Sequence, residues 1–372
     1  GPFRKEYRIE KRGLPEEKGN ISRYKDFNER IRRLADRRPW IMADWPRRTI
    51  EELIAVVGGD HYDFVLCRYA QDSYPFLDFH ESLRKRTIID CDDVMSASLF
   101  DARVPRAPGH YAGLKRHLQR KMLLSYQKRF LEFGAALFCS DEDRKEVTGP
   151  AGSPNAYVVP NTYPAMLNIG TPDGSGYENR RTLLFVGALD YGPNIAGLKW
   201  FVQSIFPKIK ERYGDIRLLV VGRRPPESLA QTCKEHPEVE LHPDVPDVRP
   251  FYHACGAVVV PLLSGGGTRI KILEAAMAGR FVLSTPIGAY GLSLGGEAGP
   301  GLFTDERGFL GQYDKLEDGN YYRECVMKMH AAVQNTYSPE AFDRSMEKVV
   351  ESLLGEGMDR IVSRSHDGRS AR

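Results

Sequence analysis

A glycine-rich segment at residues 264–275, with the sequence SGGGTRIKILEA, holds the residue types best suited to bind a charged ligand. Gly265, Gly266 and Gly267 follow an apolar run and precede a predicted helix. Because glycine has no Cβ, the backbone N–H groups of such a loop can approach a ligand closely. The helix N-terminus adds a positive partial charge, so the segment predicts a diphosphate site.

Charged side chains beside this loop support the same interpretation. Arg269 and Lys271 lie within the first turn of the predicted helix 268–278, where cations are unfavourable for helix stability unless an anion binds there. Glu274, about one turn further on, cannot favour a phosphate, but its carboxylate can accept hydrogen bonds from a ribose diol. A diphosphate next to a ribose is the chemistry of a nucleotide.

Two familiar nucleotide-binding motifs do not account for this segment. The sequence contains no GxxxxGK[ST] loop, and no GxGxxG follows a predicted strand with an acid about 20 residues later. A glycine-rich turn with a purely structural role remains the alternative.

The elements that position these residues alternate between short apolar runs and helical stretches. In the first half we expect strands at 62–67, 87–90, 135–139 and 157–161, helices at 50–57 and 111–133, and a helix capped by Ser140. In the second half we expect strands at 182–186, 216–221, 239–241, 257–261 and 281–284, and helices at 194–209, 226–235, 248–254, 268–278 and 320–354. The alternation predicts an α/β fold with two Rossmann-like, doubly wound parallel sheets, which bind ligands at the carboxyl ends of their strands.

The chain divides at a stretch rich in Gly, Pro and polar residues. We predict an N-terminal domain (1–167), a linker (168–180), a C-terminal domain (181–320), helices that pack back toward the N-terminal domain (321–362) and a disordered tail (363–372).

Composition excludes several classes of protein. The chain has 372 residues, of which 41% are hydrophobic and 28% charged, so we expect a soluble, two-domain globular protein. Its sequence has no apolar run long enough to span a membrane and no signal peptide. Six scattered cysteines, without zinc-type spacing, predict buried reduced thiols in a cytoplasmic protein and no metal site.

Positive charge gathers in the first third of the chain. Residues 1–130 hold 27 Lys and Arg against 19 Asp and Glu. The predicted helix 111–133 is amphipathic with a basic face, and its apolar stripe favours packing in the core, with peripheral membrane contact as the alternative. An anionic partner such as a lipid diphosphate would suit this half, a solvated surface is the alternative, and we expect no nucleic-acid partner.

Taken together, these motifs resemble the C-terminal domain of family 4 (group 1) glycosyltransferases over residues 182–292. The resemblance rests on five stretches in matching order and spacing: FVGALDYGPN (185–194), VVG (220–222), VPDVRP (245–250), GGGTRIKILEA (265–275) and STPIGAYGL (284–292). The N-terminal half resembles the family more weakly, through residues 62–65, 88–94, 140–143 and 158–161. The resemblance implies the GT-B fold, in which two Rossmann-like domains face each other across a cleft.

The family's chemistry is transfer of a sugar from a nucleoside diphosphate donor with retention of configuration, without a metal or cofactor. The resemblance implies that Glu274 holds the donor ribose, that Gly267 and Thr268 present N–H groups to the diphosphate, and that Val245 lies near the base. The other implied donor-binding residues are Gly187, Gly222, Gly266, Tyr290, Gly291 and Leu292.

The sequence departs from the family at three places. Gly266 stands where many relatives carry a Glu, and residues 190–194 stand where many carry Arg and Lys, so we expect Arg269 and Lys271 to act on the diphosphate, with Arg223 or Arg224 behind them. The best match to a catalytic His of the N-terminal domain is Asp92. The usual opening strand and its loop are missing from the first 60 residues, so this domain is divergent or truncated at its start.

On the acceptor side we expect Asp90, Asp93 and Asn161 beside Asp92. The alternative for the acids is a turn and helix-cap cluster. The expected function is therefore a retaining glycosyltransferase using a UDP or GDP sugar and a glycan or polyprenyl-linked acceptor, in cell-surface polysaccharide synthesis. It would work in the cytoplasm or at the inner face of the membrane. A GT-B sugar-nucleotide epimerase or hydrolase, and an inactive nucleotide- or partner-binding subunit, are the alternatives.

Overall fold

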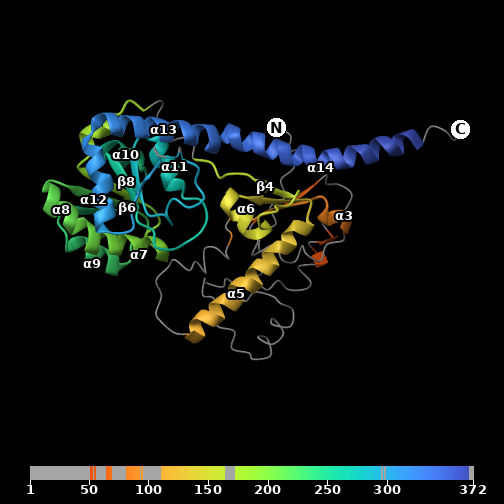
Figure 1. Cartoon of the computed structure of the whole chain (residues 1–372), viewed down its shortest axis with the longest axis horizontal. Coiled ribbons are helices and arrows are strands. Elements are labelled where there is room, and N and C mark those ends of the chain that lie inside the picture. The colour runs from red at the N-terminus through yellow and green to blue at the C-terminus, as the bar shows by residue number, and fades with distance from the viewer. Residues whose placement is uncertain are drawn as a thin grey trace.

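The computed structural model describes residues 51–52, 54–55, 64–68, 81–92, 94, 110–163, 172–294, 296 and 299–367. Two parallel sheets, each flanked by helices, make up this part of the chain (Figure 1). The expected α/β class with two parallel sheets is confirmed. Asp93, half of the predicted helix 50–57 and the first part of the predicted linker lie outside the described residues.

The N-terminal sheet has the order β1-β2-β3-β4. Its strands are β1 (Val65–Arg68), β2 (Thr87–Asp90), β3 (Ala135–Phe138) and β4 (Ala156–Val158), and its helices are α3 (Glu81–Arg84), α5 (His110–Lys128) and α6 (Asp141–Thr148). Ser140 caps α6 as predicted, because its hydroxyl accepts the Asp143 N–H. All of β3 is buried, as a strand covered on both faces must be.

The C-terminal sheet has the order β10-β9-β8-β5-β6-β7. Its strands are β5 (Thr182–Val186), β6 (Arg217–Gly222), β7 (Val239–Pro243), β8 (Ala257–Val260), β9 (Phe281–Ser284) and β10 (Gly301–Leu302). From β5 the chain adds strands first on one side and then, from β8 onward, on the other. The order therefore reverses between β5 and β8, which is where doubly wound sheets bind ligands.

Helices cover both faces of this sheet. They are α7 (Gly192–Trp200), α8 (Phe206–Tyr213), α9 (Glu227–Lys234), α10 (Arg249–Ala254), α11 (Ile270–Met277), α12 (Glu306–Asp314) and α13 (Gly319–Tyr337). The helix predicted at 194–209 is present, but a π-helical segment (Phe201–Ile205) within it divides α7 from α8. Pro207 explains the break, since it has no N–H to donate to the preceding turn.

The last helix, α14 (Pro339–Asp367), extends from the C-terminal domain along the N-terminal sheet (Figure 1). Val349 is buried there against β2, β3 and the segment after β4, and Met346 and Leu353 pack beside it. The Tyr157 and Ser352 hydroxyls lie 2.8 Å apart. The helix continues through Asp367, into the first residues of the predicted tail.

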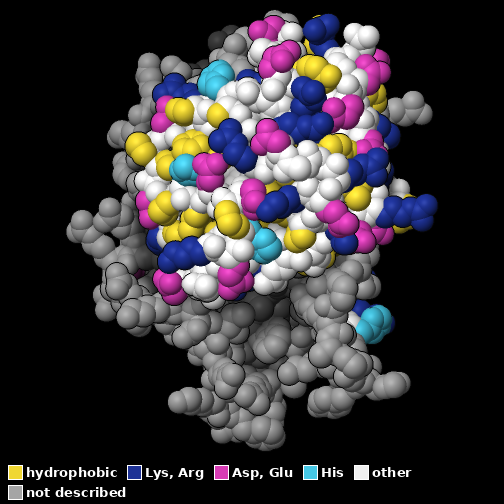
Figure 2. Space-filling model, turned by 90° about the vertical axis from the view of Figure 1, so that its left-hand side faces the viewer, with side chains coloured by type: hydrophobic (Ala, Val, Ile, Leu, Met, Phe, Trp, Pro, Cys, Tyr) yellow, Lys and Arg dark blue, Asp and Glu magenta, His cyan; other side chains and the backbone are white. Residues whose placement is uncertain are grey.

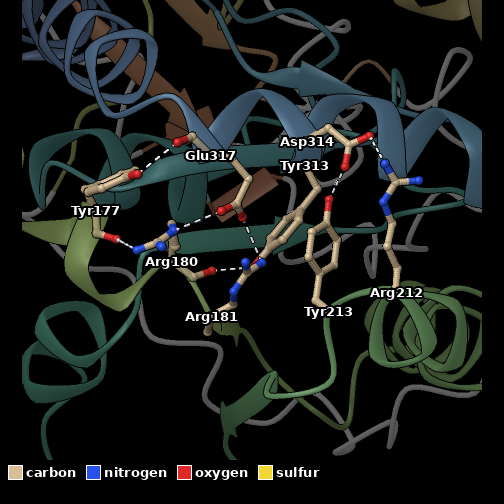
Figure 3. A network of polar contacts seen from close by, with 8 residues as sticks. All are labelled: Tyr177, Arg180, Arg181, Arg212, Tyr213, Tyr313, Asp314 and Glu317. Atoms are coloured by element: carbon tan, nitrogen blue, oxygen red, sulfur yellow. Dashed lines mark hydrogen bonds and ion pairs between the residues drawn. The ribbon is translucent and has the colours of Figure 1, made fainter.

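A polar network fastens the amino end of β5 to the helices of its own domain (Figure 3). Arg180 and Arg181 both pair with Glu317, Arg181 at 2.8 Å, and the Tyr177 hydroxyl donates to the Glu317 carbonyl oxygen at 2.8 Å. Residues 175–179 form a 3-10 helix, so this part of the predicted linker packs on the C-terminal domain. The network lies at the opposite end of β5 from the ligand-binding edge.

The outer face of the C-terminal domain carries charges of both signs, closely interspersed (Figure 2). Ion pairs such as Lys208–Glu211 and Arg212–Asp314 join them. Mixed charge of this kind gives solubility rather than a docking surface for a polyanion.

Candidate functional site

The glycine-rich loop lies at the carboxyl end of β8, next to β5. Gly265 and Gly267 have φ values of 114° and 73°, in the region that favours glycine. The predicted helix start at Thr268 is wrong, because α11 begins at Ile270 and Arg269 has the non-helical angles φ −85° and ψ 79°. Thr268 and Arg269 therefore belong to the loop itself.

Arg269 explains why the loop extends two residues further than predicted. Its guanidinium donates to the Gly267 carbonyl oxygen at 2.6 Å and also to the Gly266 carbonyl oxygen. These bonds fold the arginine side chain back onto the loop. The cation therefore fixes the loop conformation and keeps its charge beside the loop backbone.

The amino group of Lys271 lies between Asn194 and Phe185, next to the glycine-rich loop. Its Nζ donates to Asn194 Oδ1 at 2.9 Å and lies 4.6 Å from the centre of the Phe185 ring. Burial lowers the pKa of Lys271 to about 7, the positive charge of Arg269 adds to this effect, and Glu274 opposes it. The amino group is thus held where an anion would favour its charged form.

Two predicted glycines make room for this lysine. A Cβ on Gly187 would lie 2.7 Å from Lys271 Nζ and 2.9 Å from Asn194 Nδ2. A Cβ on Gly222 would lie 1.9 Å from the Gly187 carbonyl oxygen. Gly222 requires glycine because the end of β6 passes so close to the Gly187 backbone, and Gly187 leaves the space that the side chains of Lys271 and Asn194 occupy.

Glu274 is held by a tyrosine that the sequence reasoning missed. The buried Tyr252 hydroxyl of α10 donates to Glu274 Oε2 at 2.9 Å. Burial raises the pKa of Glu274, and the bond from Tyr252 and the charge of Lys271 oppose the rise. Because Tyr252 engages one carboxylate oxygen, the other is available to a ligand hydroxyl. No pattern in the sequence pairs these two residues.

The remaining predicted donor-side residues lie on neighbouring loops. Val245 and Leu292 pack against the core that contains α11, and Tyr290 is partly buried. Gly291 has a φ of 73°, and a Cβ there would lie 2.9 Å from Ser140 Oγ. The loop after β9 therefore touches the cap of α6, which belongs to the N-terminal domain.

Predicted residues of the N-terminal domain meet the glycine-rich loop. The Asn161 amide nitrogen donates to Asp92 Oδ1 at 3.0 Å and to Thr268 Oγ1 at 3.1 Å. Asp92 has a φ of 27°, which is unusual for a residue with a side chain. The structure thus brings Asp92, Asn161 and Thr268 together from the two domains.

Asp90 holds the backbone of Asp92. Its Oδ1 accepts the Asp92 N–H at 3.1 Å, and its Oδ2 lies 3.7 Å from Arg68 Nε. Burial raises the pKa of Asp90, and the bond from the Asp92 N–H opposes the rise. These contacts fit the turn interpretation for Asp90 and leave Asp92 as the acid beside the glycine-rich loop.

The secondary cation candidates are less well placed. Arg224 pairs with Asp190 at 2.6 Å, so its charge is balanced by the acid that replaces the family's usual cations. Arg223 is exposed. Arg269 and Lys271 are therefore the cations nearest the glycine-rich loop among the predicted residues.

The predicted basic helix 111–133 is α5 followed by a 3-10 turn (Arg129–Glu132). Its C-terminal half packs in the core through Leu123, Tyr126 and Phe130, whereas Leu118 is 52% exposed. Within the described residues, no helix is long and apolar enough to cross a membrane. The same part of the chain contains no group of three or more His, Cys, Asp or Glu residues arranged to hold a metal ion.

The C-terminal domain is similar to proteins of a known family. Residues 180–314 match the family model described as Glycosyl transferases group 1. A relative from Klebsiella pneumoniae, described as an uncharacterized 44.6 kDa protein in cps region, is 28% identical over 116 residues, which are 29% of this chain and 30% of the relative.

Solved structures resemble both domains. HepE from Anabaena, in complex with UDP, has a TM-score of 0.61 at 13% identity, with 82% of each chain covered. A variant of S. aureus TarM, in complex with Fondaparinux, alpha-GlcNAc-glycerol and UDP, has a TM-score of 0.57 at 12% identity. The match covers 81% of this chain and 57% of TarM, so the chain spans little more than half of that relative. The shared fold is GT-B, and the match to the Glycosyl transferases group 1 model spans residues 180–314 of this chain.

Proposed function

We propose that the protein is a retaining glycosyltransferase that moves a sugar from a UDP or GDP sugar to a glycan or lipid-linked acceptor. One observation carries the proposal: the Asn161 amide joins the Asp92 carboxylate of the N-terminal domain to the Thr268 hydroxyl of the glycine-rich loop. That contact puts an acid beside the place where the donor diphosphate would end and its sugar would begin.

The donor would bind along the loops of the C-terminal domain. The diphosphate lies against the N–H groups of Gly267 and Thr268, with Lys271 beneath it. The ribose hydroxyls donate to the Glu274 oxygen that Tyr252 does not engage. Val245 then borders the base, and the loop 290–292 borders the sugar.

Transfer requires the bond between the anomeric carbon and the diphosphate oxygen to break. Negative charge grows on the leaving diphosphate, and the loop N–H groups together with Arg269 and Lys271 are already oriented to stabilise it. An acceptor hydroxyl then forms the new glycosidic bond on the face that the diphosphate leaves, and its proton passes to the departing diphosphate oxygen. In this scheme Asp92 orients the sugar, and the two cations supply the charge for which other enzymes use a metal ion.

The acceptor would approach from the N-terminal domain. The exposed Leu118 and the cationic side chains of α5 support an acceptor carried on a lipid at the inner face of a membrane. Cell-surface polysaccharide synthesis is the setting we propose, by analogy with many enzymes of this fold.

Calorimetric titration with UDP, GDP and ADP in turn, with EDTA present, tests the donor site. We expect one of the three to bind at micromolar strength, which would name the base. The matching radiolabelled sugar nucleotides, incubated with membrane-derived acceptors, should then yield labelled glycan rather than free sugar. Failure of all three nucleotides to bind would refute the donor site, and release of free sugar alone would refute transfer.

A further inference from the structure

Four residues from four different loops form a closed ring of hydrogen bonds at the contact between the domains. Asn161 donates to Asp92 Oδ1 at 3.0 Å and to Thr268 Oγ1 at 3.1 Å. Thr268 is in turn hydrogen bonded to the Cys139 thiol. The Cys139 sulfur lies 2.7 Å from the Asp92 carbonyl oxygen, which completes the ring, and 3.3 Å from Asp143 Oδ2 of α6.

The ring joins the carboxyl ends of the N-terminal strands to the donor loop. Asp92 follows β2, Cys139 follows β3 and Asn161 follows β4, whereas Thr268 belongs to the glycine-rich loop after β8. Residues that follow three neighbouring strands of the N-terminal domain thereby hold Thr268 of the C-terminal domain. The position of the donor loop and the position of Asp92 depend on the same bonds.

Asp92 has a backbone that needs such support. Its φ of 27° costs free energy for a residue with a Cβ, and such conformations persist only where surrounding contacts impose them. In the ring the side chain of Asp92 is bonded to Asn161 and its carbonyl group faces Cys139. Asp90 also accepts its N–H.

Asparagine suits the central position for a chemical reason. Its NH₂ group supplies two N–H donors, one for the Asp92 carboxylate and one for the Thr268 hydroxyl. Thr268 then accepts from Asn161 and keeps its own proton to donate to the Cys139 sulfur. An aspartate at 161 would supply no such donors and would put a second carboxylate beside Asp92.

We propose that Asn161 is a positioning residue that couples the donor loop to Asp92, so that Asp92 takes its working position only when Thr268 is in place. The inference rests on the proposed transferase function. It assigns Asn161 a role between the domains, in place of the acceptor contact expected from the sequence.

The test compares Asn161→Ala and Thr268→Val with a matched control. Thr268→Val keeps the backbone N–H that would bind the diphosphate but removes the hydroxyl from the ring. Asn155→Ala is the control. The Asn155 amide also donates to two acceptors, the Phe133 carbonyl oxygen at 3.0 Å and the Leu131 carbonyl oxygen at 3.4 Å. These bonds lie at the amino end of the same sheet, away from the ring. This variant should lower stability and leave turnover unchanged.

We expect both ring variants to lower kcat by roughly 10- to 100-fold while the Kd for the nucleotide stays within about twofold of wild type. The double variant should be no slower than the worse single variant, because each change breaks the same ring. Thr268→Ser, which keeps the hydroxyl, should be faster than Thr268→Val. Additive losses, a normal kcat in either ring variant, or a loss of nucleotide affinity that accounts for the loss of rate would each overturn the proposal.

Hydrogen exchange gives a readout that needs no turnover. Addition of nucleotide to the wild-type chain should slow amide exchange at residues 88–92, and this protection should vanish in Asn161→Ala although nucleotide still binds. Binding without protection in the wild type would overturn the coupling. A wild-type chain that shows this protection but transfers no sugar would refute the proposed function and leave the coupling supported.

Discussion

If Lys271 binds the donor diphosphate as proposed, donor binding should depend on pH in a direction that can be calculated. Its pKa is lowered to about 7 by burial, while a nucleotide sugar carries no group that titrates between pH 7 and pH 9 on its diphosphate. A bound diphosphate favours the charged amine. Donor binding should therefore take up a proton, and affinity should fall as the pH rises through 7.

The size of the effect follows from the fraction of molecules that carry the charge. With a pKa of about 7, about one tenth are charged at pH 8, so the Kd should rise by roughly tenfold relative to pH 6. The rise should level off near pH 9, because a hydrogen bond to a charged group contributes about 1.5–3 kcal/mol, or roughly 10- to 150-fold in affinity.

The assay is calorimetric titration of the nucleotide sugar at pH 6, 7, 8 and 9, repeated at pH 8 in two buffers that differ in ionisation enthalpy. The buffer comparison should give an uptake of about 0.4 to 0.9 proton per ligand, because about one tenth of the free lysines are already charged at pH 8 and binding raises the pKa by about one to two units. Lys271→Met should bind weakly at every pH. Lys208→Met, on the exposed surface of α8, should keep the wild-type slope. A wild-type Kd that stays constant from pH 6 to pH 9, or a slope that persists in Lys271→Met, would refute the reasoning.

Three further substitutions test other parts of the site. Glu274→Ala should weaken binding of the nucleoside as well as the nucleotide by roughly 1–3 kcal/mol, through lost ribose hydrogen bonds; calorimetry that finds unchanged nucleoside binding would contradict this role. Arg269→Ala should weaken diphosphate binding far more than nucleoside binding, and equal losses would mean that Arg269 only shapes the loop. Gly222→Ala should lower the free energy of unfolding by about 2 kcal/mol or more in urea titrations, because its Cβ would lie 1.9 Å from the Gly187 carbonyl oxygen. Gly192→Ala, where a Cβ meets nothing within 4 Å, is its control.

The strands were the most predictable part of the fold. The bounds of β2, β5 and β9 agree with prediction to the residue, because a buried parallel strand is a short apolar run that ends where polar or turn residues begin. Helix starts were less predictable. The start of α11 depends on the bonds that Arg269 makes to two loop carbonyl groups, and no local propensity encodes such contacts.

The residues of the candidate site were also predictable only in part. The glycine-rich loop, its cations and Glu274 lie within one short segment, so their spacing alone predicted their proximity. The partners that hold them come from far along the chain: Tyr252 is 22 residues from Glu274, and Asn194 is 77 residues from Lys271. Such pairs arise from the packing of whole elements, and a single sequence contains no signal for them.

The position of the cation at the candidate site explains the expected dependence on pH. Where many relatives carry cations after the first strand of this domain, the chain has Asp190, which pairs with Arg224 at the exposed rim. In the proposed site the compensating cation is Lys271 of α11, whose amino group lies over the Phe185 ring and in the space that Gly187 leaves. Protonation of an amine that is buried against apolar side chains costs free energy until an anion binds beside it. A transferase whose cations stand in solvent after the first strand would keep them charged throughout this pH range. The proton uptake expected here is therefore a consequence of where this chain carries its lysine, and moving the charge back, as in Asp190→Arg combined with Lys271→Met, should restore donor affinity without the dependence on pH.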